Sequence, residues 1–434
     1  MRRFRFLFRT RTRIVLTMAV AALAAILIGS EAGLGGGRWS EVRVAVPQER
    51  FFYVYLVGGE DLTRSVEVRF HAHEAGAAEV VYARGPLDKV DAPSAVAATP
   101  SALPGGARHV YRAVLEALEP GATYHFQVRG ADGTETAPQR FSLPDGEAPL
   151  RFIEGGDLGT DAVVREMLAA AAATGPSFIV LGGDLAYANA DPDNLYRWDA
   201  FFAMWCEHLV TPDGDLIPAI AGIGNHDVNP DVGQDDTQRA PYYRAFFGPP
   251  EGPVYFTRQV GSQAAFFMLD TEYLHAIEGA QADWLAGQLA AHADASYTFA
   301  IYHEPLFPVH ARFDNPEAVL GRAHWVPHFD SFRLTAAFEH HDHALKRSHP
   351  IYAGHIAEGG TVYVGDGCIG MQPRSTDQQD AWYLAHAASK RHFWVVELGE
   401  DRARLRAVGE GGVTLDAFTV RSRRPQVAVA AGTG

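Results

Sequence analysis

The sequence predicts an α/β protein, a mixed-sheet sandwich flanked by helices, with a smaller all-β sandwich domain at its N-terminal end. Its 434 residues exceed what one ordinary hydrophobic core holds together. Strand-length runs fill residues 40–145, and strands alternate with helical segments over residues 150–420. In the second region, polar residues follow several apolar strands. We therefore expect two domains, with the chemistry in the second.

Residues 40–145 have the pattern of a β-sandwich. The stretch "SVEVRFHAH" alternates Val66, Val68 and Phe70 on one face. Further strand-length runs are "AEVVYARG", "HVYRAVLEAL" and "TYHFQVRG", with turn-rich segments such as "TPSALPGGAR" between them. "SLPDGEAP", residues 142–149, is expected to be the linker to the next domain.

From residue 150 the rhythm changes to strand, loop and helix. "LRFIEGGD", "SFIVLGGD", "LIPAIAGIGNHD" and "YTFAIYHEP" have the pattern of buried strands, and "DAVVREMLAAAAA" that of a helix. Alternating strands and helices predict an α/β domain over residues 150–420. Residues 421–434 show no pattern, and we expect a flexible tail there.

The first 32 residues form a separate segment. Six arginines and no acid precede an unbroken apolar run at residues 14–29, and Ser30 and Ala32 supply small residues for cleavage. This order is typical of a secretory signal, which predicts a secreted or periplasmic protein with no membrane contact after cleavage. An uncleaved membrane anchor is the alternative, although the apolar run is slightly short for a spanning helix.

The composition limits the partners of the chain. Its net charge is −15, and removal of the arginine-rich leader would make the remainder more acidic still. Such a surface does not favour a nucleic-acid backbone. An anionic substrate would need a locally positive site, which bound metal ions could supply. Cys206 and Cys368 could form at most one disulfide.

Polar residues recur where apolar strands end, which is where open α/β sheets place their chemistry. Taken alone, each has a simpler explanation: Asp157 could cap a helix, Asn225 and His226 could form a turn, and Tyr187 could pack. Taken together, hard oxygen ligands and imidazoles suit transition-metal ions. Two ions bridged by a carboxylate form the site used for phosphoester displacement. The full set is Asp157, Asp184, Tyr187, Asn225, His226, His303, His341 and His343.

The order of these blocks resembles a known family. "GGDLG", "GGDLAY", "GNHD", "YHEP" and "HHDH" follow one another as in the calcineurin-like metallophosphoesterases. The tyrosine in the second block resembles the purple acid phosphatase branch. "LEALEPGATYHFQVRG", residues 115–130, is similar to the late strands of fibronectin type III domains, as at the N-terminal end of that branch. The resemblance covers residues 40–420.

The resemblance implies two metal ions bridged by Asp184. Asp157, Tyr187 and His343 would complete one ligand set, and Asn225, His303 and His341 the other. A tyrosinate favours Fe(III), whereas an amide oxygen with two imidazoles suits Fe(II), Zn or Mn.

Catalytic roles follow from the same resemblance. His226 would face the substrate as general acid, with Asp227 orienting its ring. Substrate contacts are expected from Asn225 and His226. Apart from the resemblance, the loop at residues 306–325 offers His310 and Arg312 as further substrate contacts, with a solvated position as the alternative for Arg312.

The predicted activity is hydrolysis of a small phosphorylated substrate, with a metal-bound hydroxide attacking phosphorus. A phosphomonoesterase of the acid phosphatase type is the first reading, and a phosphodiesterase on the same site is the alternative. The alternative of another class is a non-catalytic exported binding protein with a vestigial metal site. The sequence leaves the oligomeric state open.

Three positions depart from the family pattern. His340 stands where the family usually has glycine, and this predicts an altered turn before His341. Leu345 and Lys346 replace the usual tyrosine and glutamate, and this predicts different support behind the ligands.

Overall fold

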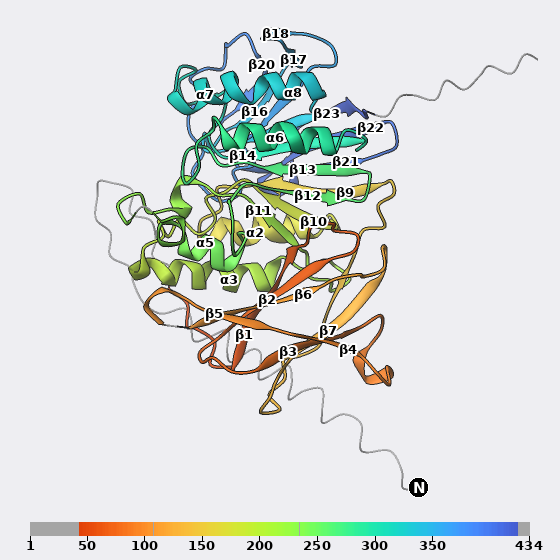
Figure 1. Cartoon of the computed structure of the whole chain (residues 1–434). Coiled ribbons are helices and arrows are strands. Elements are labelled where there is room, and N and C mark those ends of the chain that lie inside the picture. Colours follow the sequence, from red (N-terminus) through yellow and green to blue (C-terminus); the bar gives the residue numbers. More distant parts are fainter. Residues whose placement is uncertain (1–42, 107, 234, 424–434) are drawn as a thin grey trace, which may run out of the picture.

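The computed structural model describes residues 43–106, 108–233 and 235–423 (Figure 1). Within these ranges the chain is an α/β protein with large mixed sheets flanked by helices, as the sequence predicts. The proposed leader at residues 1–32 lies outside the described residues, as does the tail from residue 424. Every helix in the described part is too short or too polar to span a lipid bilayer.

The N-terminal strands form two facing sheets. One has the order β4-β3-β7-β8, and the strands of the other follow the order β1-β2-β6-β5. Val66, Val68 and Phe70 are buried between the sheets, as the alternating pattern predicts. The strands are β1 (Phe51–Gly58), β2 (Val66–Ala72), β3 (Ala78–Ala83), β4 (Ser94–Ala97), β5 (Thr99–Ala102), β6 (His109–Leu115), β7 (Thr123–Gly130) and β8 (Gln139–Ser142).

The first sheet of the second part continues into the N-terminal strands. Val57 of β1 pairs in parallel with Ala219, which gives one ten-stranded sheet of order β23-β22-β21-β9-β10-β11-β1-β2-β6-β5. The added strands are β9 (Leu150–Gly155), β10 (Phe178–Leu181), β11 (Ala219–Ala221), β21 (His392–Leu398), β22 (Arg402–Gly409) and β23 (Thr414–Arg421). Strands β9, β10 and β11 run parallel, so their carboxyl ends meet at one edge.

A second sheet packs face to face on the first. Its order is β12-β13-β14-β15-β19-β16-β20, with β13, β14, β15 and β19 parallel. Phe152, Phe178, Phe266 and Phe299 fill the core between the sheets. The strands are β12 (Phe256–Val260), β13 (Ala264–Met268), β14 (Tyr297–Tyr302), β15 (Ala336–Glu339), β16 (Leu345–Ser348), β19 (Val362–Gly365) and β20 (Leu384–Ala388), and a hairpin pairs β17 (Ile351–Tyr352) with β18 (His355–Ile356).

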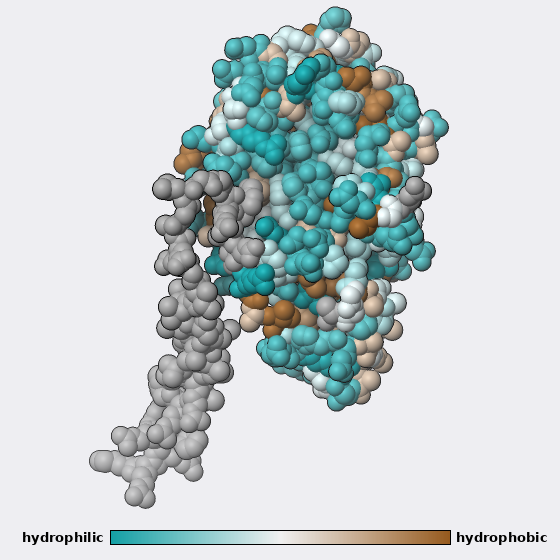
Figure 2. Space-filling view, turned by 90° about the vertical axis from the view of Figure 1, so that its left-hand side faces the viewer, coloured by the Kyte–Doolittle hydropathy of each residue, from teal (hydrophilic) through white to brown (hydrophobic). Residues whose placement is uncertain are grey.

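Helices cover the outer faces of both sheets (Figure 1). On the first sheet lie α2 (Ala162–Ala172), α3 (Leu195–His208), α4 (Asp236–Arg239) and α5 (Pro241–Phe246), and on the second α6 (Ala280–Ala291), α7 (Pro316–His324) and α8 (Val326–Phe332). The face shown in Figure 2 is mostly hydrophilic, with apolar residues in small separate groups.

The second face of β2 is buried too, although it carries polar residues. Glu67, Arg69 and His71 are buried on this face. Arg69 donates to the carbonyl oxygens of Ala245 (3.2 Å) and Gly248 (3.1 Å), and it pairs with Glu67. The two parts of the chain are therefore joined by buried polar contacts as well as by the shared sheet.

His71 is a buried titratable group of this interface without a hydrogen-bond partner in the described part of the chain. Its ring packs against Phe202 and Phe246, and neither nitrogen has a hydrogen-bond partner among the described residues. Burial, and then the charge of Arg108, lower its pKa well below 6.5. The folded protein therefore holds His71 neutral where the unfolded chain takes up a proton.

We expect this difference to make the protein acid-sensitive. Below the unfolded pKa of about 6.5, the unfolded state binds more protons at this residue, so stability falls by up to about 1.4 kcal/mol per pH unit. His71→Phe should remove this contribution. The free energy of unfolding in urea should therefore fall further for wild type than for His71→Phe as the pH is lowered from 7 to 5. His73→Phe, at an exposed position nearby, should keep the wild-type dependence. Identical pH profiles for wild type and His71→Phe would contradict the assignment.

Candidate metal centre

The predicted ligands follow the carboxyl ends of five parallel strands. Strand β9 leads to Asp157, β10 to Asp184 and Tyr187, β11 to Asn225 and His226, β14 to His303, and β15 to His341 and His343. Five of these residues have left-handed backbone, with φ of 48° at Asp157, 54° at Asp184, 57° at Tyr187, 68° at His341 and 51° at His343. This conformation is costly for residues with a Cβ atom, and it concentrates at functional sites.

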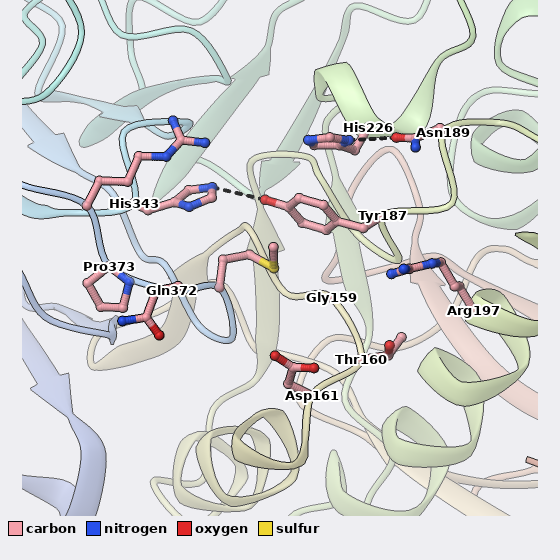
Figure 3. Close-up of a pocket in the computed structure, with 12 residues that line it drawn as sticks. Gly159, Thr160, Asp161, Tyr187, Asn189, Arg197, His226, His343, Gln372 and Pro373 are labelled. Atoms are coloured by element: carbon pink, nitrogen blue, oxygen red, sulfur yellow. Dashed lines mark hydrogen bonds between the residues drawn. The ribbon is translucent and has the colours of Figure 1, made fainter. Parts of the chain in front are cut away.

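Three side chains converge in a first group. The Tyr187 hydroxyl lies 2.9 Å from Asp157 Oδ1 and 3.0 Å from His343 Nε2, and these two atoms are 2.9 Å apart. Tyr187 and His343 also line a pocket, and Figure 3 shows them pointing toward each other at its wall.

A second group lies around Asn225. Its Oδ1 is 3.1 Å from His303 Nε2 and 3.0 Å from His341 Nδ1. Asp184 Oδ2 lies 3.3 Å from His303 Nε2. Asp184 also has an oxygen within 4.8 Å of a ligand atom of Asp157, so its carboxylate lies between the two groups.

The spacing of these atoms fits metal ions. Ligand atoms bound at about 2.0–2.2 Å around one ion lie about 3 Å apart in octahedral geometry. The donors of His303 support this fit, because its Nδ1 faces the Gly182 carbonyl at 3.0 Å and must donate there. In a neutral His303 the Nε2 lone pair would face two oxygens, of Asn225 and Asp184, so this position calls for either a proton on Nε2 or a metal ion between the atoms.

The electrostatics of the centre also call for positive charge. Burial alone would raise the pKa of Asp157, but His343 and His303 hold it well below its usual range. Burial would lower the pKa of His303, but the carboxylates of Asp184 and Asp157 raise it well above the usual value. Burial and the same two carboxylates raise the pKa of Tyr187 well above its usual value. Metal ions would supply the charge that the carboxylates require.

His226 lies beside the ligands and lines the pocket. Its backbone N–H donates to Asp184 Oδ1 (2.7 Å), and its ring stacks on Tyr187 with centroids 4.3 Å apart. Its Nδ1 lies 2.6 Å from Asn189 Oδ1 (Figure 3). Because the Asn189 oxygen accepts a hydrogen bond, His226 Nδ1 carries a proton and donates it. Nε2 is then the ring nitrogen that can contact a molecule in the pocket.

The structure corrects the orienting role expected for Asp227. Its carboxylate accepts the backbone N–H groups of Asp184 (2.7 Å), Leu185 (3.1 Å) and Gly224 (3.0 Å). It therefore joins the two loops that carry Asp184 and Asn225, while Asn189 contacts the His226 ring. "GGDLAYANA" contains Asn189 two residues after Tyr187, but the sequence gives no reason to aim it at His226.

Neither His310 nor Arg312 is among the residues that line the pocket. Arg312 is largely exposed and pairs with Asp314 at 2.6 Å within its own loop. The His310 ring lies 3.0 Å from the Ser375 carbonyl oxygen. The arginines of the pocket are instead Arg197, from α3, and Arg374, which sequence reasoning missed.

His340 takes the place of the expected glycine without removing the turn. Its buried ring places Nδ1 2.8 Å from the Tyr302 carbonyl oxygen and Nε2 2.6 Å from Glu154 Oε1. A Cβ atom at Gly182 would lie 1.9 Å from this ring, so the glycine there makes room for the histidine. His341 keeps its left-handed backbone.

Lys346 supplies different support from the expected glutamate. Its ammonium donates to Glu339 Oε2 (2.7 Å) and to the Phe307 carbonyl (2.9 Å). Glu339 Oε1 accepts from the Leu306 N–H at 2.7 Å. This buried pair fixes the loop that follows His303, while Leu345 packs between the sheets.

We expect Lys346→Met to destabilise the fold by about 3–5 kcal/mol, because it leaves the Glu339 carboxylate buried without its counter-charge. Adding Glu339→Gln should recover much of this loss in urea unfolding. Arg129→Met, which breaks the largely exposed pair with Glu135, should cost less than about 1 kcal/mol. A Lys346→Met loss no larger than that of Arg129→Met would show that the pair contributes little.

No family model matches the chain. Two uncharacterised proteins of Mycobacterium tuberculosis, from two strains, are 24% identical to it over 281 residues, covering 56% of this chain and 51% of each relative. The chain thus spans about half the length of these relatives. "Probable purple acid phosphatase 20" of Arabidopsis thaliana is 24% identical over 314 residues, covering 67% of this chain and 68% of that protein.

Solved structures show the same fold. Purple acid phosphatase PPD1 from yellow lupin (Lupinus luteus) seeds has a TM-score of 0.73 at 18% identity, covering 86% of this chain and 74% of that one. PhoD has a TM-score of 0.64 at 13% identity, covering 89% and 95%. The chain has the purple acid phosphatase-like metallophosphoesterase fold. The fibronectin type III likeness of residues 40–145 stays a prediction.

Proposed function

We propose that the protein is an exported phosphoester hydrolase that uses two metal ions, and that it acts on phosphomonoesters. One observation carries the proposal: two groups of ligand atoms, each spaced at about 3 Å, meet at the Asp184 carboxylate beside a pocket. The likeness to purple acid phosphatase and PhoD supports the same reading. Export rests on the composition of residues 1–32.

One ion would be held by Asp157, Tyr187 and His343, and the other by Asn225, His303 and His341. Asp184 would bind both ions. When bound, the ions would activate water and neutralise charge on the phosphoryl group. A phenolate at Tyr187 favours Fe(III) on the first ion, and the second ligand set suits Fe(II), Zn or Mn.

The chain's own residues would position and protonate the substrate. The pocket wall formed by His226 and His343 would bind the phosphoryl group. His226, oriented through Nδ1 by Asn189, would hold a proton at Nε2 and pass it to the leaving oxygen. Asp227 would keep the Asp184 and Asn225 loops together.

Metal analysis of the purified protein, with parallel assays, tests the proposal. We expect about two metal ions per chain and a higher kcat/KM for an alkyl phosphate than for the corresponding dialkyl phosphate. A higher kcat/KM for the diester would make the protein a phosphodiesterase. Metal-free protein, or bound metal without hydrolysis of either ester, would favour the non-catalytic alternative.

Tyr187→Phe tests the first ion. A phenolate on Fe(III) absorbs visible light by charge transfer, so the iron-loaded wild type should be coloured and the variant colourless. The variant should keep partial hydrolysis, because Asp157, His343 and Asp184 still hold that ion. Tyr273→Phe removes a hydroxyl 3.3 Å from Glu304, outside the ligand set, and should leave the colour unchanged. Iron-loaded wild type without a visible band would assign Tyr187 to packing.

A further inference from the structure

The pocket extends beyond the metal-binding side chains. Its volume is about 390 Å³, within the range of sites that bind a small organic molecule. Tyr187, His226 and His343 form one part of its wall, and Arg197 reaches in from α3 toward its middle (Figure 3). An ester whose phosphoryl group lies against the ligands would extend the rest of its structure toward Arg197.

The charge of Arg197 has no partner in the described part of the chain. The residue is half-buried, its guanidinium carbon lies 5.9 Å from the ring of the preceding Tyr196, and its side chain forms no hydrogen bond or ion pair with the described residues. Arg374, which also lines the pocket, is held in place: its Nη1 donates to the His341 carbonyl oxygen (3.0 Å), and its backbone N–H donates to the His343 carbonyl oxygen (3.0 Å). In a chain of net charge −15, an unpaired pocket arginine favours an anion from outside.

Asp161 is the carboxylate that lines the same pocket. It forms no ion pair with Arg197 among the described residues, and its side chain caps no N–H group of α2. Its charge would disfavour an anion that binds nearby. Removing Asp161 and removing Arg197 should therefore act in opposite directions on an anionic ligand.

We propose that Arg197 binds a second anionic group of the substrate and so selects phosphate esters that also carry a carboxylate or a further phosphate. The guanidinium donates paired N–H groups that match either oxyanion. This inference rests on the proposed function, because it assigns the part of the substrate that is not hydrolysed.

Matched substrates test the proposal. Glycerol 2-phosphate and 2-phosphoglycerate differ only by a hydroxymethyl group in place of a carboxylate, and 3-hydroxypropyl phosphate and propane-1,3-diyl bisphosphate supply the phosphate comparison. Wild type should prefer at least one substrate with two anionic groups. Arg197→Gln should lower kcat/KM for that substrate by roughly tenfold to a hundredfold, the range for a lost hydrogen bond to a charged group. The loss should fall mainly on KM.

The controls separate this role from folding. Arg197→Gln should leave kcat/KM for glycerol 2-phosphate within roughly threefold of the wild-type value. Arg197→Lys should recover part of the loss on the substrate with two anionic groups, and Asp161→Asn should raise kcat/KM for that substrate. Arg402→Gln, at an exposed position on β22, should leave kcat/KM unchanged for both kinds of substrate. Equal kcat/KM within both pairs, unchanged by Arg197→Gln, would overturn the inference and leave the phosphoesterase standing. No hydrolysis of any of the four esters would overturn both.

Discussion

Asp184→Asn should abolish binding of both metal ions and reduce kcat/KM at least about a thousandfold, since a Lewis-acid centre supplies several kcal/mol of transition-state stabilisation. Asp184 is buried and lies between the two ligand groups, with Oδ2 3.3 Å from His303 Nε2. Each ion would lose the shared carboxylate at once. The amide has nearly the same volume and keeps an oxygen that can accept the His226 backbone N–H, so we expect the fold to survive.

The measurements are metal content by mass spectrometry and turnover of an alkyl phosphate. Asp161→Asn is the matched control, because it removes one carboxylate that lines the neighbouring pocket and lies outside the ligand set. It should retain both metals and hydrolyse an alkyl phosphate that has no second anionic group at close to the wild-type rate. A folded Asp184→Asn protein with two ions and near-normal turnover would remove Asp184 from the bridging position.

The fold could be predicted where local pattern decides the structure. The alternation of Val66, Val68 and Phe70 gives the inward face of β2, and the structure buries these residues. The same pattern does not show what covers the opposite face, yet Glu67 and His71 are buried there, and His71 packs against Phe202 and Phe246 of the second part. That burial depends on a contact between distant segments, which the period of one strand does not encode.

The continuation of one sheet through both parts is a long-range feature of the same kind. A single parallel pair, Val57 with Ala219, joins β1 to β11. A parallel pairing between strands so far apart in sequence leaves no local turn signal, unlike a hairpin. The sequence therefore carries no local signal that one sheet continues through both parts of the chain.

The candidate ligands could be predicted because strand ends give their direction. Parallel neighbouring strands bring their carboxyl ends to one edge, so residues such as Asp157, after β9, and Asp184, after β10, lie close together. Asn189 lies in a loop, and Arg197 lies on α3. The direction of each side chain depends on tertiary packing and is not given by the end of a strand. His340 departs from the family pattern, and Gly182, directly after β10, makes room for its ring.

Replacing His226 should lower kcat for poor leaving groups by roughly 10²–10⁴, the usual contribution of a positioned proton donor. His226→Ala keeps the backbone N–H that donates to Asp184, so the metal content should remain at the wild-type value. The loss should shrink strongly for 4-nitrophenyl phosphate, because its phenolate leaves without a proton. An alkyl phosphate and this aryl ester, assayed side by side, therefore separate proton donation from phosphate binding.

Two further variants separate the proton from the ring. His226→Phe preserves an aromatic ring for stacking on Tyr187, now at 4.3 Å, but holds no proton, so it should lose as much activity as His226→Ala. Asn189→Leu keeps the imidazole but removes the acceptor 2.6 Å from Nδ1, and it should give a smaller loss with the same dependence on the leaving group. Recovery of activity by His226→Phe would reduce His226 to packing. An equal loss on alkyl and aryl esters would assign it to phosphate binding, because only a proton donor distinguishes the two leaving oxygens.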